Sequence, residues 1–391
     1  MASTLDDIRI IDVDTHVIEP PDLWTSRVDA KWGDRRPHVR WDPATGRESW
    51  FIGDAPITGV GTSAMAGWAE YPPAHPRTWD EIDPVMWDAK ARLAMMDGYG
   101  IESQILYPNV LLFHSGGLQD ADARSLQLEC VQAYNDFLSE WSEVAPKRLI
   151  PMSSLPFWDL EATLAEVQRC ARQGHRGVIF TQDPSYFGLP ALADVHWDPL
   201  WALTQELGLP VNFHIGSADA SFPTPPSPQT GPQAAYAAMG VSFFMANART
   251  VAQLITGGIC HRFPELNFVS VESGIGWIPY FLESLDWQWA NFGPSQEHPD
   301  FSLARPSEYF HRQIYASFWF EQASARFALD ILGPDNVFYE TDFPHPTCQF
   351  PGPATIAVTP REYIETAIGD LPEATLRKIL HDNAARIYHI G

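Results

Sequence analysis

The sequence predicts an α/β fold, a parallel (β/α)8 TIM barrel, on two observations. Short runs of β-branched and aromatic residues alternate with amphipathic helical segments from one end of the chain to the other. Eight such strand-like runs can be counted, and so regular an alternation favours a closed barrel over a doubly wound open sheet, which is the alternative. We therefore expect residues 1–391 to form a single barrel domain with elaborations.

The first unit of the barrel consists of a strand over 8–13, a long insertion and a helix. The pair Asp83-Pro84 is typical of a helix start, and Gly98 and Gly100 are typical of a helix end. The other expected strands cover 103–107, 149–154, 177–180, 210–214, 267–272, 313–318 and 337–342. The expected helices between them include 121–141, 159–173 and a segment capped by Asp198 that ends at Gly208.

Two segments are longer than ordinary connections in such a barrel. Residues 17–81 are rich in Pro, Gly and Trp, and we expect them to form a lid or a small subdomain. Residues 217–233 contain five prolines and follow the fifth strand, so we expect an active-site loop there.

Composition and charge exclude several classes of protein. The formal net charge of −24 argues against nucleic acid and anionic membranes as partners, because both require excess Lys and Arg. The sequence has no run of 18 apolar residues and no recognisable signal peptide, so we expect no membrane span and a cytoplasmic location. Motifs for a phosphate-binding loop, a dinucleotide site and a serine nucleophile are also absent from the sequence.

Side chains suited to metal binding follow the predicted strands at their carboxyl ends, where barrels carry their catalytic groups. They are Asp14 and His16 after the first strand, His214 at the end of the fifth, Glu272 at the end of the sixth, Glu321 after the seventh, and Asp342 with His345 after the eighth. In Asp14-Thr15-His16 the two ligand types are two residues apart, so both reach the same side of an extended backbone. A buried Glu272 needs a cation or strong donors.

The same residues also have simpler interpretations, which the sequence leaves open. His214 could be a hydrogen-bonded core histidine, and Glu272 could cap the following helix. Glu321 and Glu19 are weaker candidates that could serve a second metal, orient a ligand or play a structural role.

Three further residues have side chains of the metal-binding type. Glu340, two residues before Asp342, could replace it as a ligand. His75 and His261 are expected to lie on the surface or in the lid.

Four ordered segments of the sequence resemble the amidohydrolase-related (amidohydrolase 2) family. They read IDVDTHVIEPPDLW, VNFHIG, FVSVESGIGWIPYFLE and ETDFPHP. The resemblance implies a metal-dependent distorted barrel with Asp14, His16, His214 and Asp342 as ligands. Hydrolases of the family commonly open with H-x-H, and its decarboxylases usually carry a histidine after the sixth strand, where this sequence has Asp14 and Glu272. The long form with ESGIGWIP, FWFE and ETDFPHP looks more like a branch of non-haem diiron oxygenases that act on coenzyme A thioesters.

The leading expectation is therefore a non-haem diiron monooxygenase that hydroxylates an apolar small molecule, with an acyl-CoA thioester as one candidate. Histidines with several carboxylates suit one or two Fe ions, with Zn or Mn as alternatives, and Glu272 could bridge two ions. The catalytic candidates are Glu272, Asp342 and His345. The first alternative is a metal-dependent hydrolase or non-oxidative decarboxylase, and the second is a catalytically silent ligand-binding barrel. Two chains are expected to pair as a homodimer.

Overall fold

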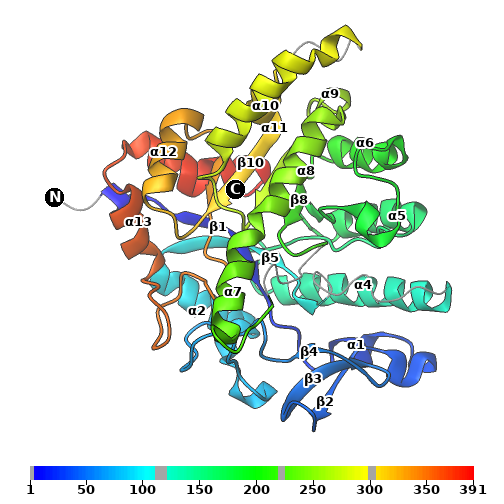
Figure 1. Cartoon of the computed structure of the whole chain (residues 1–391). Helices are drawn as coiled ribbons and strands as arrows, with labels where there is room; N and C mark the ends of the chain where they lie inside the picture. The colour runs from blue at the N-terminus through cyan, green and yellow to red at the C-terminus, as the bar shows by residue number, and fades with distance from the viewer. Residues whose placement is uncertain (1–3, 111–120, 219–224, 298–304) are drawn as a thin grey trace.

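The computed structural model describes residues 4–110, 121–218, 225–297 and 305–391, and eight parallel strands form its centre (Figure 1). One sheet contains β1 (Ile10–His16), β5 (Ile101–Tyr107) and β6 (Leu149–Pro151), and the other contains β7 (Val178–Ile179), β8 (Val211–His214), β9 (Phe268–Val271), β10 (Ile314–Phe318) and β11 (Val337–Tyr339). Parallel bridges from Thr15 to Phe343 and from Ser153 to Val178 join the two sheets at both edges. The strands thus follow one another around a ring, as predicted for a (β/α)8 barrel.

Helices surround the strands and connect them. The helices are α1 (Leu23–Arg27), α2 (Ala89–Tyr99), α4 (Ala121–Ser142), α5 (Leu160–Arg172), α6 (Asp198–Glu206), α7 (Gly231–Ser242), α8 (Phe244–Thr256), α9 (Ile259–Arg262), α10 (Ile278–Phe292), α11 (Pro306–Gln313), α12 (Ala323–Leu332), α13 (Pro360–Ile368), α14 (Glu373–Arg377) and α15 (Asn383–Ile387). Figure 1 shows α4, α5, α6 and α8 along one side of the strands and α12 and α13 on the other. None of the helices in the described ranges is long and apolar enough to cross a membrane.

The start of the first barrel helix differs from the prediction. Asp83 does cap a helical turn, because its carboxylate accepts a hydrogen bond from the N–H of Val85. That turn is a short 3-10 helix, Pro84–Met86, and α2 begins only at Ala89, where Asp88 accepts a hydrogen bond from the N–H of Ala91. A second capping aspartate therefore displaces the helix start by one turn.

Apolar side chains pack on both sides of the barrel wall. An inner cluster contains alternate strand residues, such as Ile11, Val13 and Val269, together with Ala384, Ile387 and Tyr388 near the C-terminus. A larger outer cluster fills the space between strands and helices. The hydroxyls of Tyr388 and Tyr107 both donate to Oδ1 of Asn212, at 2.7 and 3.1 Å. The C-terminal segment therefore closes the interior of the barrel.

The insertion 17–81 contains an antiparallel sheet outside the barrel. Its strands are β2 (His38–Asp42), β3 (Arg47–Ile52) and β4 (Ala55–Gly59), and Figure 1 shows them beside α1. Further along the insertion, the N–H groups of Met65 and Ala66 both donate to the carbonyl of Pro344, at 3.1 and 3.0 Å. The insertion therefore contacts the loop that follows β11. In the second long segment, 217–233, residues 219–224 lie outside the described residues, and the segment runs into α7.

Candidate metal centre

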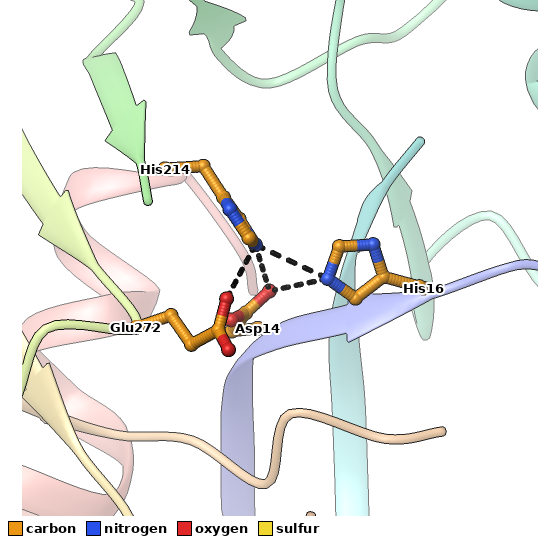
Figure 2. Close-up of side chains that lie close together, drawn as sticks. All are labelled: Asp14, His16, His214 and Glu272. Carbon is orange, nitrogen blue, oxygen red and sulfur yellow. Dashed lines mark hydrogen bonds and ion pairs between the residues drawn. The ribbon is translucent and has the colours of Figure 1, made fainter. Parts of the chain in front are cut away.

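Ligand-type side chains from four strand ends meet inside the mouth of the barrel. One ligand atom each from Asp14, His16, His214 and Glu272 lies within 4.8 Å of the others, and Figure 2 shows the four side chains pointing toward one another. A second group with the same spacing contains His16, Glu272, Asp342 and His345. The convergence predicted from the strand-end positions is therefore present.

An irregularity in β1 aims two of these side chains inward. Asp12 pairs with Gln104 of β5 and Thr15 pairs with Leu106, so three steps along β1 correspond to two along β5. The extra residue is a β-bulge, and it changes the alternation of side chains. Val13 lies in the inner apolar cluster and the next residue, Asp14, also faces the barrel interior, with His16 two residues further. The strand continues to His16 rather than ending at Val13 as predicted.

The two histidines of the first group present the same nitrogen to the centre. Nδ1 of His16 lies 3.0 Å from the carbonyl of Pro108, and Nδ1 of His214 lies 2.8 Å from the carbonyl of Ile215. A carbonyl only accepts, so in both rings Nδ1 carries a hydrogen that it donates. The two Nε2 atoms face each other at 3.1 Å. This is the tautomer that binds a metal through Nε2.

The carboxylate of Asp14 lies between these nitrogens without hydrogen bonds. It is fully buried, and its Oδ1 lies 3.5 Å from Nε2 of both His16 and His214. Neither of its oxygens accepts a hydrogen bond from any residue in the described ranges. Buried carboxylate oxygens in this condition are costly unless a cation satisfies them. The donor set of imidazole nitrogens and carboxylate oxygens fits a divalent metal ion.

Backbone strain marks the other two carboxylates. Glu272 directly follows β9 and Asp342 lies just beyond β11, and they adopt φ values of 56° and 59°. A residue other than glycine adopts this left-handed backbone conformation at a cost of about 1 to 3 kcal/mol. Such strain persists where the surrounding structure requires it, and here it directs two carboxylates into one site.

Electrostatics within the site favour a bound cation. Burial, and after it the charge of Asp342, raise the pKa of Glu272 well above its ordinary value, and burial followed by the charge of Asp14 raises the pKa of Asp342. Burial lowers the pKa of His214, but the charges of Asp14 and Glu272 outweigh it and raise that pKa to about 9. Without a metal ion, these carboxylates and His214 bind protons, and the protons reduce the negative charge of the site. A bound metal ion would supply that positive charge instead.

His345 is held between Asp342 and a residue that the sequence analysis missed. Its Nδ1 lies 2.8 Å from Oδ1 of Asp342, and its Nε2 lies 3.0 Å from Oδ1 of Asn109. The ring also stacks on His16, with 3.8 Å between ring centroids. Asn109 comes two residues after β5, so the same strand-end rule that selected the other residues would have selected it.

Glu19 and Glu321 lie outside both ligand groups, and the structure does not place either as a metal ligand. Glu19 accepts hydrogen bonds from the N–H groups of Asn109 and Val110, at 2.8 and 3.1 Å. Glu321 accepts from the N–H groups of Ile275 and Gly276, at 2.9 and 2.7 Å. Each carboxylate therefore secures a loop that follows a barrel strand.

The remaining candidates lie around the site or away from it. Glu340 is fully buried near Glu272 but belongs to neither ligand group. His75 lies in the insertion 17–81, where it is buried, and its Nδ1 lies 2.7 Å from the carbonyl of Pro76. His261 is partly buried against the hydroxyl of Tyr309.

Beneath the bulge in β1, a buried polar network supports the strand. Asp12 accepts hydrogen bonds from the N–H and the hydroxyl of Thr341, at 2.8 and 2.6 Å, and from Nε2 of Gln104, at 3.1 Å. Arg92 is fully buried and donates to Gln104 and to the carbonyl of His16. These contacts link β1 to β5 and to the loop after β11, and the sequence analysis did not identify them.

Comparison with known proteins identifies relatives across nearly the whole chain. The sequence model of the family described as amidohydrolase matches residues 11–390. The gamma-resorcylate decarboxylase of Rhizobium sp. (strain MTP-10005) is 26% identical over 289 residues, which cover 68% of this chain and 80% of that protein.

Solved structures match the fold over the same extent. The structure of an amidohydrolase from Mycobacterium avium subsp. paratuberculosis K-10 matches with a TM-score of 0.75 at 22% identity, and the match covers 98% of this chain and 99% of that one. A dihydroxybenzoic acid decarboxylase from Polaromonas sp. JS666, with bound manganese and the inhibitor 2-nitroresorcinol, matches with a TM-score of 0.64 at 19% identity over 98% of this chain and 97% of that one. At these identities the structural matches show the fold alone.

These relatives change the leading expectation. The gamma-resorcylate decarboxylase supports the decarboxylase alternative better than the diiron monooxygenase. These relatives give no support to iron, to dioxygen chemistry or to an acyl-CoA substrate. We expected iron because the ligand set is rich in carboxylates, but manganese binds the same donor atoms. Pairing of two chains and a cytoplasmic location stay predictions.

Proposed function

The chain belongs to the amidohydrolase family, and from that premise we propose that it is a divalent-metal-dependent decarboxylase that releases CO2 from a small phenolic carboxylic acid without oxidation. The observation that carries the proposal is the buried Asp14 carboxylate, which has no hydrogen-bond partner in the described ranges and lies 3.5 Å from two imidazole nitrogens. The decarboxylases among its relatives supply the reaction class.

We propose that the ion is held by the first ligand group, Asp14, His16, His214 and Glu272, together with Asp342 of the second group, which shares His16 and Glu272 with the first. We propose Mn²⁺, because three carboxylates make the donor set rich in oxygen and because a structural neighbour contains manganese. When bound, the ion would act as a Lewis acid toward the oxygens of the substrate.

The substrate must be held despite the charge of the protein. The chain carries a formal charge of −24, and a carboxylate substrate is also negative. Among the described residues Arg92 is the one buried Lys or Arg, but its guanidinium already donates to the carbonyls of Val85 and His16 and to Gln104. The substrate carboxylate therefore needs the metal ion as its counter-charge. The side chain of Glu272 is 10% exposed, whereas His214 beside it is fully buried, so the substrate approaches from the side of Glu272.

Loss of CO2 leaves an electron pair on the ring carbon, and a proton must take its place. Oδ1 of Asp342 and Nδ1 of His345 are 2.8 Å apart, and Oδ1 accepts no hydrogen bond from the described residues, so it is open to receive a proton from the ring or the substrate side. We assign delivery of the proton to this pair. The substrate carboxylate plus one proton then give CO2 and the protonated ring carbon, so atoms and charge balance.

The insertion 17–81 is proposed to act as a lid on this site. Its Met65 and Ala66 bind the carbonyl of Pro344, the residue before His345. A movement of the insertion would therefore be transmitted to the loop that carries His345. The single-domain organisation over 1–391 and the role of 217–233 as an active-site loop belong to the same proposal.

Anaerobic CO2 release tests the proposed function. The protein would be stripped of metal, reloaded with Mn²⁺, Zn²⁺ or Fe²⁺, and incubated without oxygen with a panel of hydroxybenzoates that includes gamma-resorcylate. We expect CO2 in equal amount to the phenolic product, with one metal ion per chain. Two iron ions per chain together with a requirement for O2 would overturn the proposal.

A pair of histidine variants separates the proton donor from a general effect of histidine loss. His345→Asn is expected to lower kcat by about 100- to 10,000-fold, which is the usual contribution of general acid catalysis. His381→Asn is the matched control, because Nδ1 of His381 also lies 2.8 Å from a carboxylate, that of Asp382, but on the surface. An equal loss in both variants would exclude His345 from the reaction.

A further inference from the structure

We propose that Glu19, acting through Asn109, is a positioning residue that decides which nitrogen of His345 carries the ring hydrogen. A chain of hydrogen bonds runs from Glu19 through Asn109 to His345. Its consequence for catalysis rests on the proposed function, but the arrangement itself does not.

The carboxylate of Glu19 acts only as an acceptor. It is buried, with 2% of its surface exposed, and its Oε1 accepts from the N–H groups of Asn109 and Val110. Its Oε2 accepts from Nδ2 of Asn109, at 3.1 Å. Three N–H donors thus converge on two oxygens, an arrangement that only an ionised carboxylate satisfies in full.

These contacts fix the orientation of the Asn109 amide. Its Nδ2 donates to the carbonyl of Val17, at 2.9 Å, as well as to Glu19. If the amide were turned over, Oδ1 would face two acceptors and both would lose their donor. Oδ1 of Asn109 must therefore be the atom that faces His345.

The orientation of Asn109 in turn fixes the tautomer of His345. Oδ1 of Asn109 only accepts, so Nε2 of His345, 3.0 Å away, carries a hydrogen. In the neutral ring Nδ1, which faces Asp342, is then the nitrogen without a hydrogen. The stacking of His345 on His16 holds the plane of the ring but does not decide which nitrogen carries the hydrogen.

The other two histidines of the site have the opposite arrangement. Nδ1 of His16 and of His214 face backbone carbonyls, so both present Nε2 to the centre. A point substitution leaves a backbone carbonyl in place, so it cannot remove the acceptor of His16 or His214. The acceptor of His345 is the side chain of Asn109, which is itself held by the side chain of Glu19. His345 is therefore the one histidine of these three whose tautomer a conservative substitution can reverse.

Glu19→Gln is the substitution that tests this. The amide oxygen of the new side chain can still accept the two backbone N–H groups, but its NH2 group then faces Nδ2 of Asn109, donor against donor. Asn109 relieves this conflict by turning over, which places Nδ2 against Nε2 of His345 and gives up the hydrogen bond from Nδ2 to the carbonyl of Val17. Nε2 then becomes an acceptor and the hydrogen of the ring moves to Nδ1.

Nitrogen NMR of the metal-free protein reads the tautomer directly. With ¹⁵N-labelled histidine, and with His345→Gln to assign the signal, Nε2 of His345 is expected to carry a hydrogen in the wild type and none in Glu19→Gln. Asn109→Leu, which removes the acceptor while keeping a similar volume, is expected to give the same loss. Retention of the hydrogen on Nε2 in both variants, or its absence in the wild type, would overturn the proposal.

Glu321→Gln is the matched control. Glu321 is also buried and also accepts two consecutive backbone N–H groups, but these belong to Ile275 and Gly276 rather than to the loop of Asn109. The His345 signal should be the same in this variant as in the wild type, and a loss of the Nε2 hydrogen here would show a general effect of removing a buried carboxylate, against the proposal.

Kinetics separate this inference from the proposed function. In the metal-loaded enzyme, Glu19→Gln is expected to lower kcat by about 10- to 100-fold with KM little changed, as is usual for residues that orient a ligand or catalytic group. If the NMR result holds while the wild type releases no CO2, the proposed function fails and the positioning role of Glu19 stands. If CO2 is released equally fast by wild type and variant, the positioning role has no part in the reaction and the inference fails.

Discussion

Replacement of Glu340 with glutamine is expected to stabilise the metal-free protein, and to do so more strongly as the pH rises. Glu340 is fully buried, its Oε1 has no hydrogen-bond partner in the described ranges, and its Oε2 lies 3.3 Å from the backbone nitrogen of Glu272. Burial, and next the charge of Asp14, raise its pKa well above the ordinary value. Glutamine has nearly the same shape, carries no charge and can donate a hydrogen bond to the carboxylates around it.

The sign follows from the number of protons bound. A carboxyl group whose pKa is raised by folding binds more protons in the folded state, so its contribution to stability falls as the pH rises above the unfolded pKa. Between the unfolded and the folded pKa, the free energy of unfolding decreases by about 1.4 kcal/mol per pH unit. For a chain of 391 residues this corresponds to about 2 °C in Tm. The advantage of Glu340→Gln should therefore grow by about 2 °C per pH unit from about pH 5 upward.

Thermal unfolding in the presence of a chelator, at several pH values between about 5 and 8, measures this difference. A Tm difference between Glu340→Gln and wild type that does not change with pH would refute the reasoning, as would a variant less stable than wild type at the upper end of this range. Asp342→Asn serves as a companion, because Asp342 belongs to a ligand group and Glu340 does not. We expect Asp342→Asn to lose metal affinity and Glu340→Gln to retain it.

Two further substitutions probe the support of the site. Gly274→Ala would place a Cβ 2.8 Å from Oε2 of Glu321 at a φ of +70°, whereas Gly188→Ala meets nothing within 4 Å at a φ of +74°. Each substitution should lower the free energy of unfolding by about 1 to 2 kcal/mol through backbone strain, and Gly274→Ala should lower it further because of the close approach to Glu321. Denaturant unfolding measures both values, and equal losses would show that the approach is harmless. Asp12→Asn should destabilise the protein by about 1 to 3 kcal/mol both with and without metal, because the NH2 group that replaces Oδ2 cannot accept from the hydroxyl of Thr341 or from Nε2 of Gln104. Unchanged stability in the same assay would contradict the structural role of Asp12.

The parts of the fold that the sequence predicted are those with a strong local signal. Strands such as 210–214 and 337–342 are short apolar runs, and the structure contains β8 and β11 within them. The pair Asp83-Pro84 does begin a helical turn, but local sequence could not show that Asp88 would cap the longer helix. The antiparallel sheet of the insertion was not predicted, since its strands are partly exposed and lack a continuous apolar run.

The candidate site likewise has features that the sequence predicted and features that it did not. The rule that catalytic groups follow barrel strands assigned Asp14 and Asp342 to one site although they are far apart in the sequence, and the N–H of Asp342 does donate to the carbonyl of Asp14, at 3.0 Å. The bulge in β1 was not predictable, because it is defined by pairing with β5. The roles of Glu19 and Glu321 were ambiguous because they depend on backbone N–H groups in distant loops, whose positions no local pattern contains.

The closed floor of the barrel bears on how the protein is made in the cell. The interior of the barrel is sealed by Ala384, Ile387 and Tyr388. A nascent chain whose strands β1 to β11 have all left the ribosome therefore still has a barrel that is open at one end. Asp14 is synthesised before Tyr388, and the two lie within the same barrel. The ligands are therefore all synthesised before the interior can close, and the barrel is completed only when translation has passed its last helix.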